Sequence, residues 1–202
     1  MLLDICLGTR TSWKILLLLS ETPGKMLTRK QIQEHTKMGN KVLVKFLLLL
    51  ERFDLLQTSK TGRKHFYRLN MQNPFMKAII ELIDVEHRQL NAVYFAHLLI
   101  LREFVYELTN FDFENIRRII LFGSVAKHTA RVDSDIDLAI ITKEKTLPHE
   151  QLLHTDLADR LKNRFGNEIQ IHYFTETEFE KLRKTGNKVV NEITLDGLIV
   201  VG

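Results

Sequence analysis

Two acidic residues stand two positions apart in a segment that otherwise has the composition of a buried strand. Residues 121–141 read LFGSVAKHTARVDSDIDLAII, with Gly123-Ser124 after one apolar run and Asp135 and Asp137 beginning the next. Residues two apart on a strand point to the same face, so the two carboxylates are expected side by side. Adjacent carboxylates repel unless a cation lies between them, and such hard oxygen ligands suit Mg²⁺ (or Mn²⁺) together with phosphate oxygens.

The Gly123-Ser124 pair has the chemistry of a phosphate contact. Glycine lets the backbone approach a ligand closely, serine adds a hydroxyl, and a short helix beginning at Ser124 would point its N–H groups at an anion. A phosphate site that faces a metal-binding strand can support metal-assisted nucleotidyl transfer from a nucleoside triphosphate. The alternative is a ligand-free loop with a Ser-Asp turn beside an edge strand.

The elements that must position these residues alternate between strand and helix. Apolar runs predict strands, the helical spacing of residues 149–165 stops at Gly166, and Thr175 to Glu178 is a capping box that opens another helix. The C-terminal segment NEITLDGLIVVG (residues 191–202) predicts a helix, a turn at Gly197 and a last strand. The strands are expected at residues 117–122, 136–141 and 168–174.

The motif itself resembles a known family. GSVAKHTARVDSDIDLAI is similar to the GSxARGx(n)SDxDL signature of the DNA polymerase β-type nucleotidyltransferases, in particular the minimal ones. The resemblance implies a small mixed sheet with helices on one side, over most of residues 111–202. It also implies that Gly123 and Ser124 contact the nucleoside triphosphate, that Asp135 and Asp137 hold the divalent metal, and that Ser134 is a further nucleotide-binding candidate.

The sequence departs from the family pattern at two positions. His128 stands where the family usually has glycine, and could narrow the pocket or contact a phosphate. The third carboxylate expected on a neighbouring strand aligns with Gln170, which can neither bind a metal strongly nor act as a base. Glu168 and His172 lie on the same predicted strand face, and Glu168 is the better substitute as a catalytic acid.

Residues 10–70 predict a different order of elements, with three helical segments followed by two short strands. A capping box at Thr28 to Gln31 opens the second helix, and Asn40 is a candidate N-cap for the third. A glycine-containing turn at residues 60–63 predicts a β-hairpin. This order resembles the winged helix-turn-helix domain of prokaryotic transcription regulators.

Basic residues of this region suit contacts with the phosphates of double-stranded DNA. The alternatives are a solvated surface, or a winged helix that contacts only proteins, because the third helix is unusually apolar (VLVKFLLLL). The DNA-binding candidates are Asn40, Lys41, Lys45, Arg63, Lys64 and Arg68.

Residues 74–110 carry apolar residues at helical spacing, with Pro74 at the expected first helical position. They predict one long helix or two stacked helices, serving as a linker and as the interface of a homodimer. The region is too interrupted by His97, Arg102 and Glu103 to read as a membrane span.

Composition fits a folded cytoplasmic protein. The 202 residues are 45% hydrophobic and 27% charged, the net charge is +4, and the one cysteine, Cys6, excludes an internal disulfide. The N-terminal segment shows no signal-peptide pattern. No metal-binding spacing is evident among the histidines.

The sequence therefore predicts a two-domain α+β protein: a winged helix-turn-helix over 1–73, a helical linker over 74–110 and a nucleotidyltransferase-like domain over 111–202. The first hypothesis is an enzyme that transfers a nucleotidyl group to an unknown acceptor, and the resemblance makes a toxin-like helical partner protein a candidate. The second is a DNA-binding transcription regulator whose nucleotidyltransferase domain senses nucleotide without turnover. The third is a structural adaptor.

Overall fold

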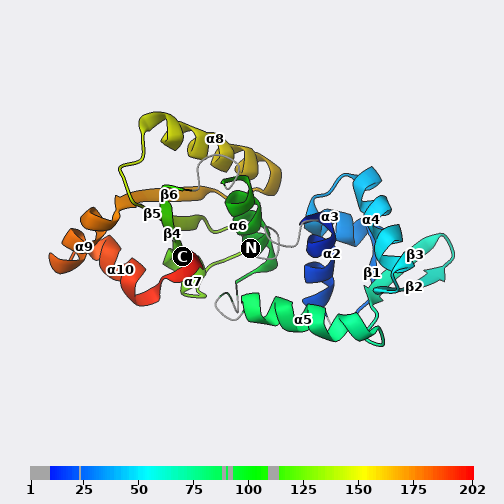
Figure 1. Cartoon of the computed structure of the whole chain (residues 1–202). Coiled ribbons are helices and arrows are strands. Elements are labelled where there is room, and N and C mark those ends of the chain that lie inside the picture. Colours follow the sequence, from blue (N-terminus) through cyan, green and yellow to red (C-terminus); the bar gives the residue numbers. More distant parts are fainter. Residues whose placement is uncertain (1–9, 23, 88–89, 91–92, 109–113) are drawn as a thin grey trace. The chain divides into compact units, whose positions relative to one another are not determined.

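The computed structural model describes the chain except for residues 1–9, 23, 88–89, 91–92 and 109–113. The chain divides into two compact units, residues 2–88 (the first unit) and residues 89–202 (the second unit) (Figure 1). The predicted helical region at 74–110 is two helices: α5 (Pro74–His87) belongs to the first unit and α6 (Phe95–Leu108) to the second. The roles predicted for 1–73, 74–110 and 111–202 stay predictions.

The described residues of the first unit form three helices and one very short strand, followed by a hairpin and a last helix. Its sheet is antiparallel in the order β1-β3-β2. The elements are α2 (Arg10–Ser20), β1 (Leu27–Thr28), α3 (Arg29–Thr36), α4 (Asn40–Arg52), β2 (Leu56–Thr61), β3 (Lys64–Leu69) and α5.

Local signals explain most of the helix boundaries in this unit. Thr28 accepts a hydrogen bond from the Gln31 backbone N–H at 3.3 Å, while the Gln31 side chain accepts from the Thr28 N–H at 2.9 Å, so the predicted capping box is confirmed. Asn40 was expected to be the N-cap of α4. It is instead the first helical residue, and the N-cap is Gly39, which makes no side-chain hydrogen bond.

Helix α4 buries one narrow apolar stripe. Leu43, Leu47 and Leu50 follow the four- and three-residue spacing of a helix face and are 0%, 1% and 4% exposed. This helix packs against α2 and β2. Its remaining leucines lie on its outer side.

The second unit is a four-stranded mixed sheet with helices. The strand order is β6-β5-β4-β7, with β4 antiparallel to both its neighbours and β5 parallel to β6. The elements are α6, β4 (Ile116–Phe122), α7 (Gly123–Ala126), β5 (Ile136–Thr142), α8 (Pro148–Phe165), β6 (Ile169–Thr175), α9 (Glu176–Lys184), α10 (Lys188–Asp196) and β7 (Leu198–Val201).

Helices cover both faces of this sheet, which corrects the expectation of helices on one side. Ile119 and Leu121 of β4 join Leu138 of β5 in a core with α6 and α8. Residues at the alternate positions, such as Phe122 and Ala139, join a second core with α9 and α10 (Figure 1). Because side chains alternate along a strand, odd-numbered residues of β5 belong to the face of α9 and α10.

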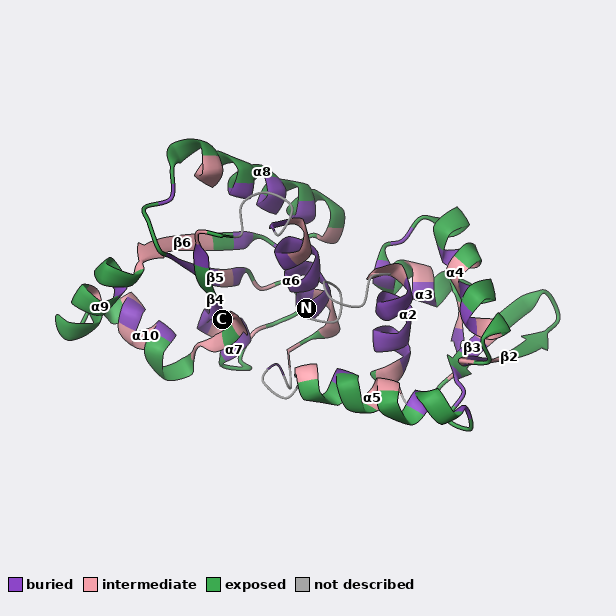
Figure 2. Ribbon diagram, viewed as in Figure 1, coloured by how far each residue is buried: buried purple, intermediate pink, exposed green. Residues whose placement is uncertain are grey.

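Helix α6 is a core element of the second unit. Every residue from His97 to Val105 is buried, whereas α8 presents an exposed side (Figure 2). The apolar surface that predicted a dimer interface is, in α6, enclosed within the chain. None of the helices in the described residues is long and apolar enough to cross a membrane.

Candidate functional site

The site is built where strand β4 turns directly into helix α7. Gly123 has φ +69°, and a Cβ placed on it would lie 2.2 Å from Oδ2 of Asp137. The register pairs Phe122 with Asp137, so the turn after β4 stands beside the start of β5. Only glycine allows both this left-handed backbone and this close approach of a carboxylate.

The two carboxylates of the motif lie at the start of β5. Asp135 precedes the strand and is exposed, while Asp137 is its second residue and is half-buried. Gln170 of β6 is the register partner of Asp137, and its Nε2 donates to Oδ2 of Asp135 at 3.1 Å. The amide thus occupies the place beside both acids where a third carboxylate was expected.

The electrostatics of this corner oppose the charged form of Asp137. Burial raises the pKa of the Asp137 carboxyl, and the charges of Asp135 and Glu192 raise it further, while nearby His172 acts in the opposite direction. The His172 ring also packs edge-on against Phe122, with ring centroids 5.3 Å apart. A bound cation would relieve this unfavourable concentration of negative charge.

The loop before Asp135 is held by hydrogen bonds. Ser134 Oγ accepts from the Arg131 N–H at 2.8 Å, and Asn167 Nδ2 donates to the Ser134 carbonyl at 3.0 Å. Asn167 also lies 3.3 Å from Nε2 of the fully buried His97. The Ser134 hydroxyl therefore holds the loop, and its predicted contact with nucleotide stays a prediction.

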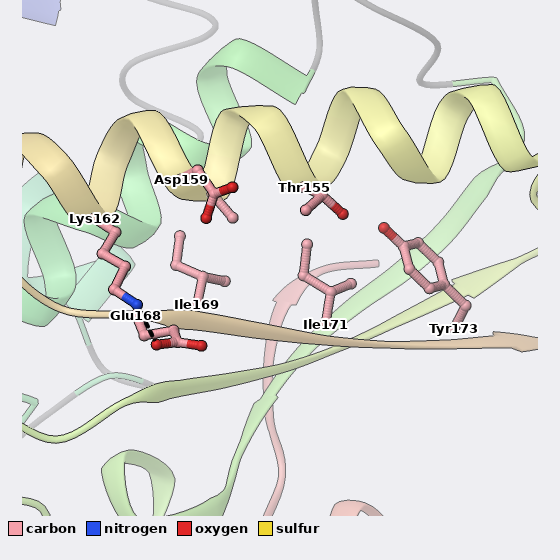
Figure 3. A pocket seen from close by; sticks show the side chains of 8 residues that line it. Thr155, Asp159, Lys162, Glu168, Ile169, Ile171 and Tyr173 are labelled. Atoms are coloured by element: carbon pink, nitrogen blue, oxygen red, sulfur yellow. Dashed lines mark hydrogen bonds and ion pairs between the residues drawn. The ribbon is translucent and has the colours of Figure 1, made fainter.

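Glu168 and Gln170 are both exposed and flank the buried Ile169, and the catalytic role of Glu168 stays a prediction. Glu168 precedes β6, and its carboxylate pairs with Lys162 of α8 at 2.5 Å. Figure 3 shows this pair at one end of a hollow of about 170 Å³ between α8 and β6, which Ile171 and Tyr173 also line. The hydrogen bond and the charge of Glu168 raise the pKa of the Lys162 ammonium, and the charge of Asp135 adds to this, so the pair lies near the acids of the motif.

The end of α7 is followed by a lysine, which contacts two acids of α10, and by a histidine. His128 is exposed with φ +58°, a backbone conformation that favours glycine and accounts for glycine in the family pattern. Lys127 donates to Oε1 of Glu192 at 2.6 Å and lies 3.6 Å from Oδ2 of Asp196. Sequence reasoning missed Glu192, because a single acid on a helix far along the chain carries no motif signal.

The donor set fits a metal that arrives with phosphate oxygens. No group of three or more histidine, cysteine or acidic side chains that could hold a metal ion occurs among the described residues. Mg²⁺ is commonly bound by one or two carboxylates together with substrate phosphates and water. Asp135 and Asp137 supply that number, so the site fits a metal bound with nucleotide better than a metal held by protein alone.

The predicted DNA-binding residues fall into two groups in the first unit. Arg63 and Lys64, at the hairpin turn, line a hollow of about 520 Å³, whereas Asn40, Lys41 and Lys45 lie on α4 outside its lining. The Nε of Arg68 donates to Oε1 of Gln57 at 2.9 Å. We call this hollow the basic hollow; it is lined by Thr28, Arg29, Lys30, Arg63, Lys64, His65 and Tyr67.

The sequence of the second unit matches a known family. Residues 108–194 match the sequence model described as "Polymerase beta, Nucleotidyltransferase". This stretch is a polymerase β-type nucleotidyltransferase domain. It spans less than half of the 202 residues and includes the whole β4-α7-β5 corner. No curated protein matches the chain significantly in sequence.

Several solved structures resemble the chain. A toxin–antitoxin structure with AMP-PNP is 19% identical, with 49% of this chain and 71% of that chain covered and a TM-score of 0.36. The tri-AMPylated HEPN toxin of Shewanella oneidensis in complex with MNT antitoxin is 17% identical, with 52% and 72% covered and a TM-score of 0.34. TrmBL2, an archaeal chromatin protein, is 14% identical, with 96% and 72% covered and a TM-score of 0.31. At these TM-scores the likenesses carry no argument about function.

Proposed function

We propose that the nucleotidyltransferase domain transfers a nucleotidyl group from a nucleoside triphosphate to an acceptor hydroxyl, with Mg²⁺ or Mn²⁺. The observation that carries the proposal is the contact of the Asp137 carboxylate with the backbone of Gly123, at the turn from β4 into α7. It brings the predicted metal ligand and the predicted phosphate contact into one corner. The family match at residues 108–194 supports the same reaction class.

In the proposed reaction the acceptor oxygen bonds to the α-phosphorus while the bond to the β-phosphate oxygen breaks, and pyrophosphate leaves. A divalent ion, when bound, would neutralise charge on the phosphates. Asp135 and Asp137 would hold it, and Gly123 and Ser124 would contact the triphosphate. Gln170 cannot accept the proton of the acceptor, so we expect turnover to be slow.

Labelled nucleoside triphosphates test this function. The intact protein, incubated with Mg²⁺ and an extract as the source of acceptor, should release pyrophosphate and label an acceptor. Asp135→Asn should abolish both. Asp133→Asn is the matched control, because Asp133 is an exposed acid two positions away whose nearest charged neighbour is Arg131, at 3.9 Å. Equal rates in wild type and Asp135→Asn would refute the proposal.

A DNA-binding regulator that senses nucleotide without turnover is the second candidate. Two observations favour it: an amide, Gln170, stands where the third acid was expected, and the first unit has the helix, strand, helix, helix, hairpin order of a winged helix-turn-helix. Tight nucleotide binding without pyrophosphate release, together with salt-sensitive binding of double-stranded DNA, would support this candidate over the first. Absence of both activities would leave only a structural adaptor.

Protein partners are part of the same proposal. A toxin-like helical protein is the proposed acceptor or partner. A homodimer is proposed through α5, on which Phe75, Leu82 and Val85 are 72%, 45% and 57% exposed. Light scattering of the purified chain tests the dimer. A monomer at micromolar concentration would contradict it.

A further inference from the structure

The basic hollow of the first unit concentrates positive charge without an opposing acid. Four of its seven lining residues are arginine or lysine, and none is aspartate or glutamate. Within the described residues, Arg29, Arg63 and Lys64 form no ion pair, and Lys30 reaches only Glu34, at 3.7 Å between two well exposed side chains. An exposed ion pair of this kind contributes little free energy. Three of these four cations therefore form no ion pair with a described residue and attract an anion, and Glu51, which is not in the lining, is near enough to act on Tyr67.

The start of helix α3 adds to this charge. Arg29 and Lys30 occupy its first turn, where there is no acidic residue. The N-terminus of a helix carries a partial positive charge, so cations there are unfavourable unless an anion binds nearby. The capping box at Thr28 stabilises the helix start but supplies no negative charge. An anion bound near this helix start would relieve the unfavourable position of Arg29 and Lys30.

Tyr67 adds a neutral hydrogen-bond donor to the lining of the hollow. It lines the hollow, yet its side chain is only 8% exposed, and its hydroxyl makes no hydrogen bond with a described residue. Burial raises the pKa of this phenol and the charge of Glu51 raises it further, while Arg29 acts in the opposite direction. The phenol is therefore neutral, and its hydroxyl can donate a hydrogen bond to an anion in the hollow.

Beyond Asn40, Lys41 and Lys45, the exposed side of α4 is largely apolar. Val42, Leu48, Leu49 and Phe53, which follow one another along and just after this helix, are 45%, 59%, 38% and 64% exposed. Aliphatic side chains can contact a thymine methyl group but cannot form the paired hydrogen bonds that distinguish most bases. Contacts from the basic hollow would instead go to phosphates, which position a protein on DNA without reading its sequence.

We propose that the basic hollow is a phosphate-binding site through which the first unit holds the backbone of double-stranded DNA without sequence preference. This inference rests on the DNA-binding half of the proposed function. It adds Arg29, Lys30 and Tyr67 to the predicted contacts. It also assigns the main role to Arg63 and Lys64 rather than to the residues of α4.

Fluorescence anisotropy with the full-length chain tests the site. Two labelled 20-base-pair duplexes of unrelated sequence are titrated at several salt concentrations, and their dissociation constants should agree within about twofold. Four cations of the hollow, each releasing about 0.9 counterion, give a salt slope of about 3.6 in magnitude (4 × 0.9). Arg29→Ala and Arg63→Ala should each lower that slope by about 0.9.

Tyr67→Phe should weaken binding of both duplexes about 2- to 10-fold without changing the salt slope, because it removes a neutral hydrogen bond. A circular dichroism melt checks that this variant is folded. Lys77→Ala is the control, because Lys77 is an 86% exposed cation of the same unit on α5, outside the lining of the hollow. It should leave the slope and affinity unchanged.

Three outcomes would overturn the proposal. Arg29→Ala, Arg63→Ala and Tyr67→Phe could all bind like wild type. One duplex could be preferred more than tenfold, or RNA over DNA. Inorganic phosphate could bind while duplexes do not. Asp135→Asn should leave DNA binding unchanged, so failure here is distinguishable from failure of nucleotidyl transfer.

Discussion

Substitution of Gly123 by alanine should damage the site by two separable physical effects. Gly123 has φ +69°, and a left-handed backbone costs an L-residue about 1–2 kcal/mol. The added Cβ would lie 2.2 Å from Oδ2 of Asp137 and 3.0 Å from its Cγ. Overpacking of this kind costs about 1–3 kcal/mol. The sum predicts a loss of about 2–5 kcal/mol of stability, and a displaced Asp137.

Gly186 offers a matched control in the same unit. Its φ is +73°, and a Cβ built there meets no atom within 4 Å. Gly186→Ala should therefore cost only the backbone contribution of about 1–2 kcal/mol. The excess cost of Gly123→Ala over Gly186→Ala measures the clash with Asp137.

Native-state hydrogen exchange of peptides from β4 and β5 measures these costs within the second unit. Fluorescence of Trp13, the chain's single tryptophan and a residue of α2, checks that the first unit keeps its structure. An Asp137→Ala background removes the contacts with Oδ2 and Cγ and keeps only the Cβ contact at 3.3 Å, so Gly123→Ala should cost little more there than Gly186→Ala. Equal costs of the two glycine substitutions in the wild-type background would refute the reasoning.

Three further predictions follow from the same contacts. Asp137→Asn should raise the free energy of unfolding at pH 7, because burial raises the pKa of the Asp137 carboxyl and so penalises its ionised form. The gain should vanish at pH 3, where the carboxyl is protonated in both the folded and the unfolded state. Urea denaturation at the two pH values measures the difference. Glu168→Gln should leave the rate of pyrophosphate release within about twofold of the wild-type rate, because the Glu168 carboxylate is engaged with Lys162. Gln170→Glu should raise that rate about tenfold or more, because it supplies the third acid. The reverse order of effects would contradict this assignment. Thr175→Ala should destabilise the second unit by about 1 kcal/mol in urea denaturation, because Thr175 Oγ1 accepts a hydrogen bond from the Glu178 N–H at 3.1 Å. Thr175→Ser should keep this N-cap hydrogen bond and the stability.

Local sequence signals predicted the elements well. The capping boxes at Thr28 and Thr175 and the glycine after α8 define helix ends through contacts within a few residues, and the structure contains all three. Continuous apolar runs placed β4 and β5 correctly, because strands buried on both faces are apolar along their length. Asp135 and Asp137 were singled out because they interrupt such a run.

Contacts between distant segments could not be predicted in this way. Glu192 influences Asp137 only because α10 packs beside α7, and no short-range pattern encodes that packing. Glu168 pairs with Lys162 because α8 packs beside β6, and no short-range pattern encodes that packing either. The basic hollow likewise joins residues 28–30 to residues 63–67 through the pairing of β1 with β3.

The central claim is that Asp135 and Asp137 together bind a divalent metal with a nucleoside triphosphate. Electron paramagnetic resonance of Mn²⁺, titrated into the full-length chain with a non-hydrolysable ATP analogue, measures bound and free metal directly. We predict saturable Mn²⁺ binding that depends on the analogue and is lost in Asp135→Asn and in Asp137→Asn, while Asp133→Asn binds like wild type. Unchanged Mn²⁺ binding in both site variants, or none in the wild type, would contradict the account.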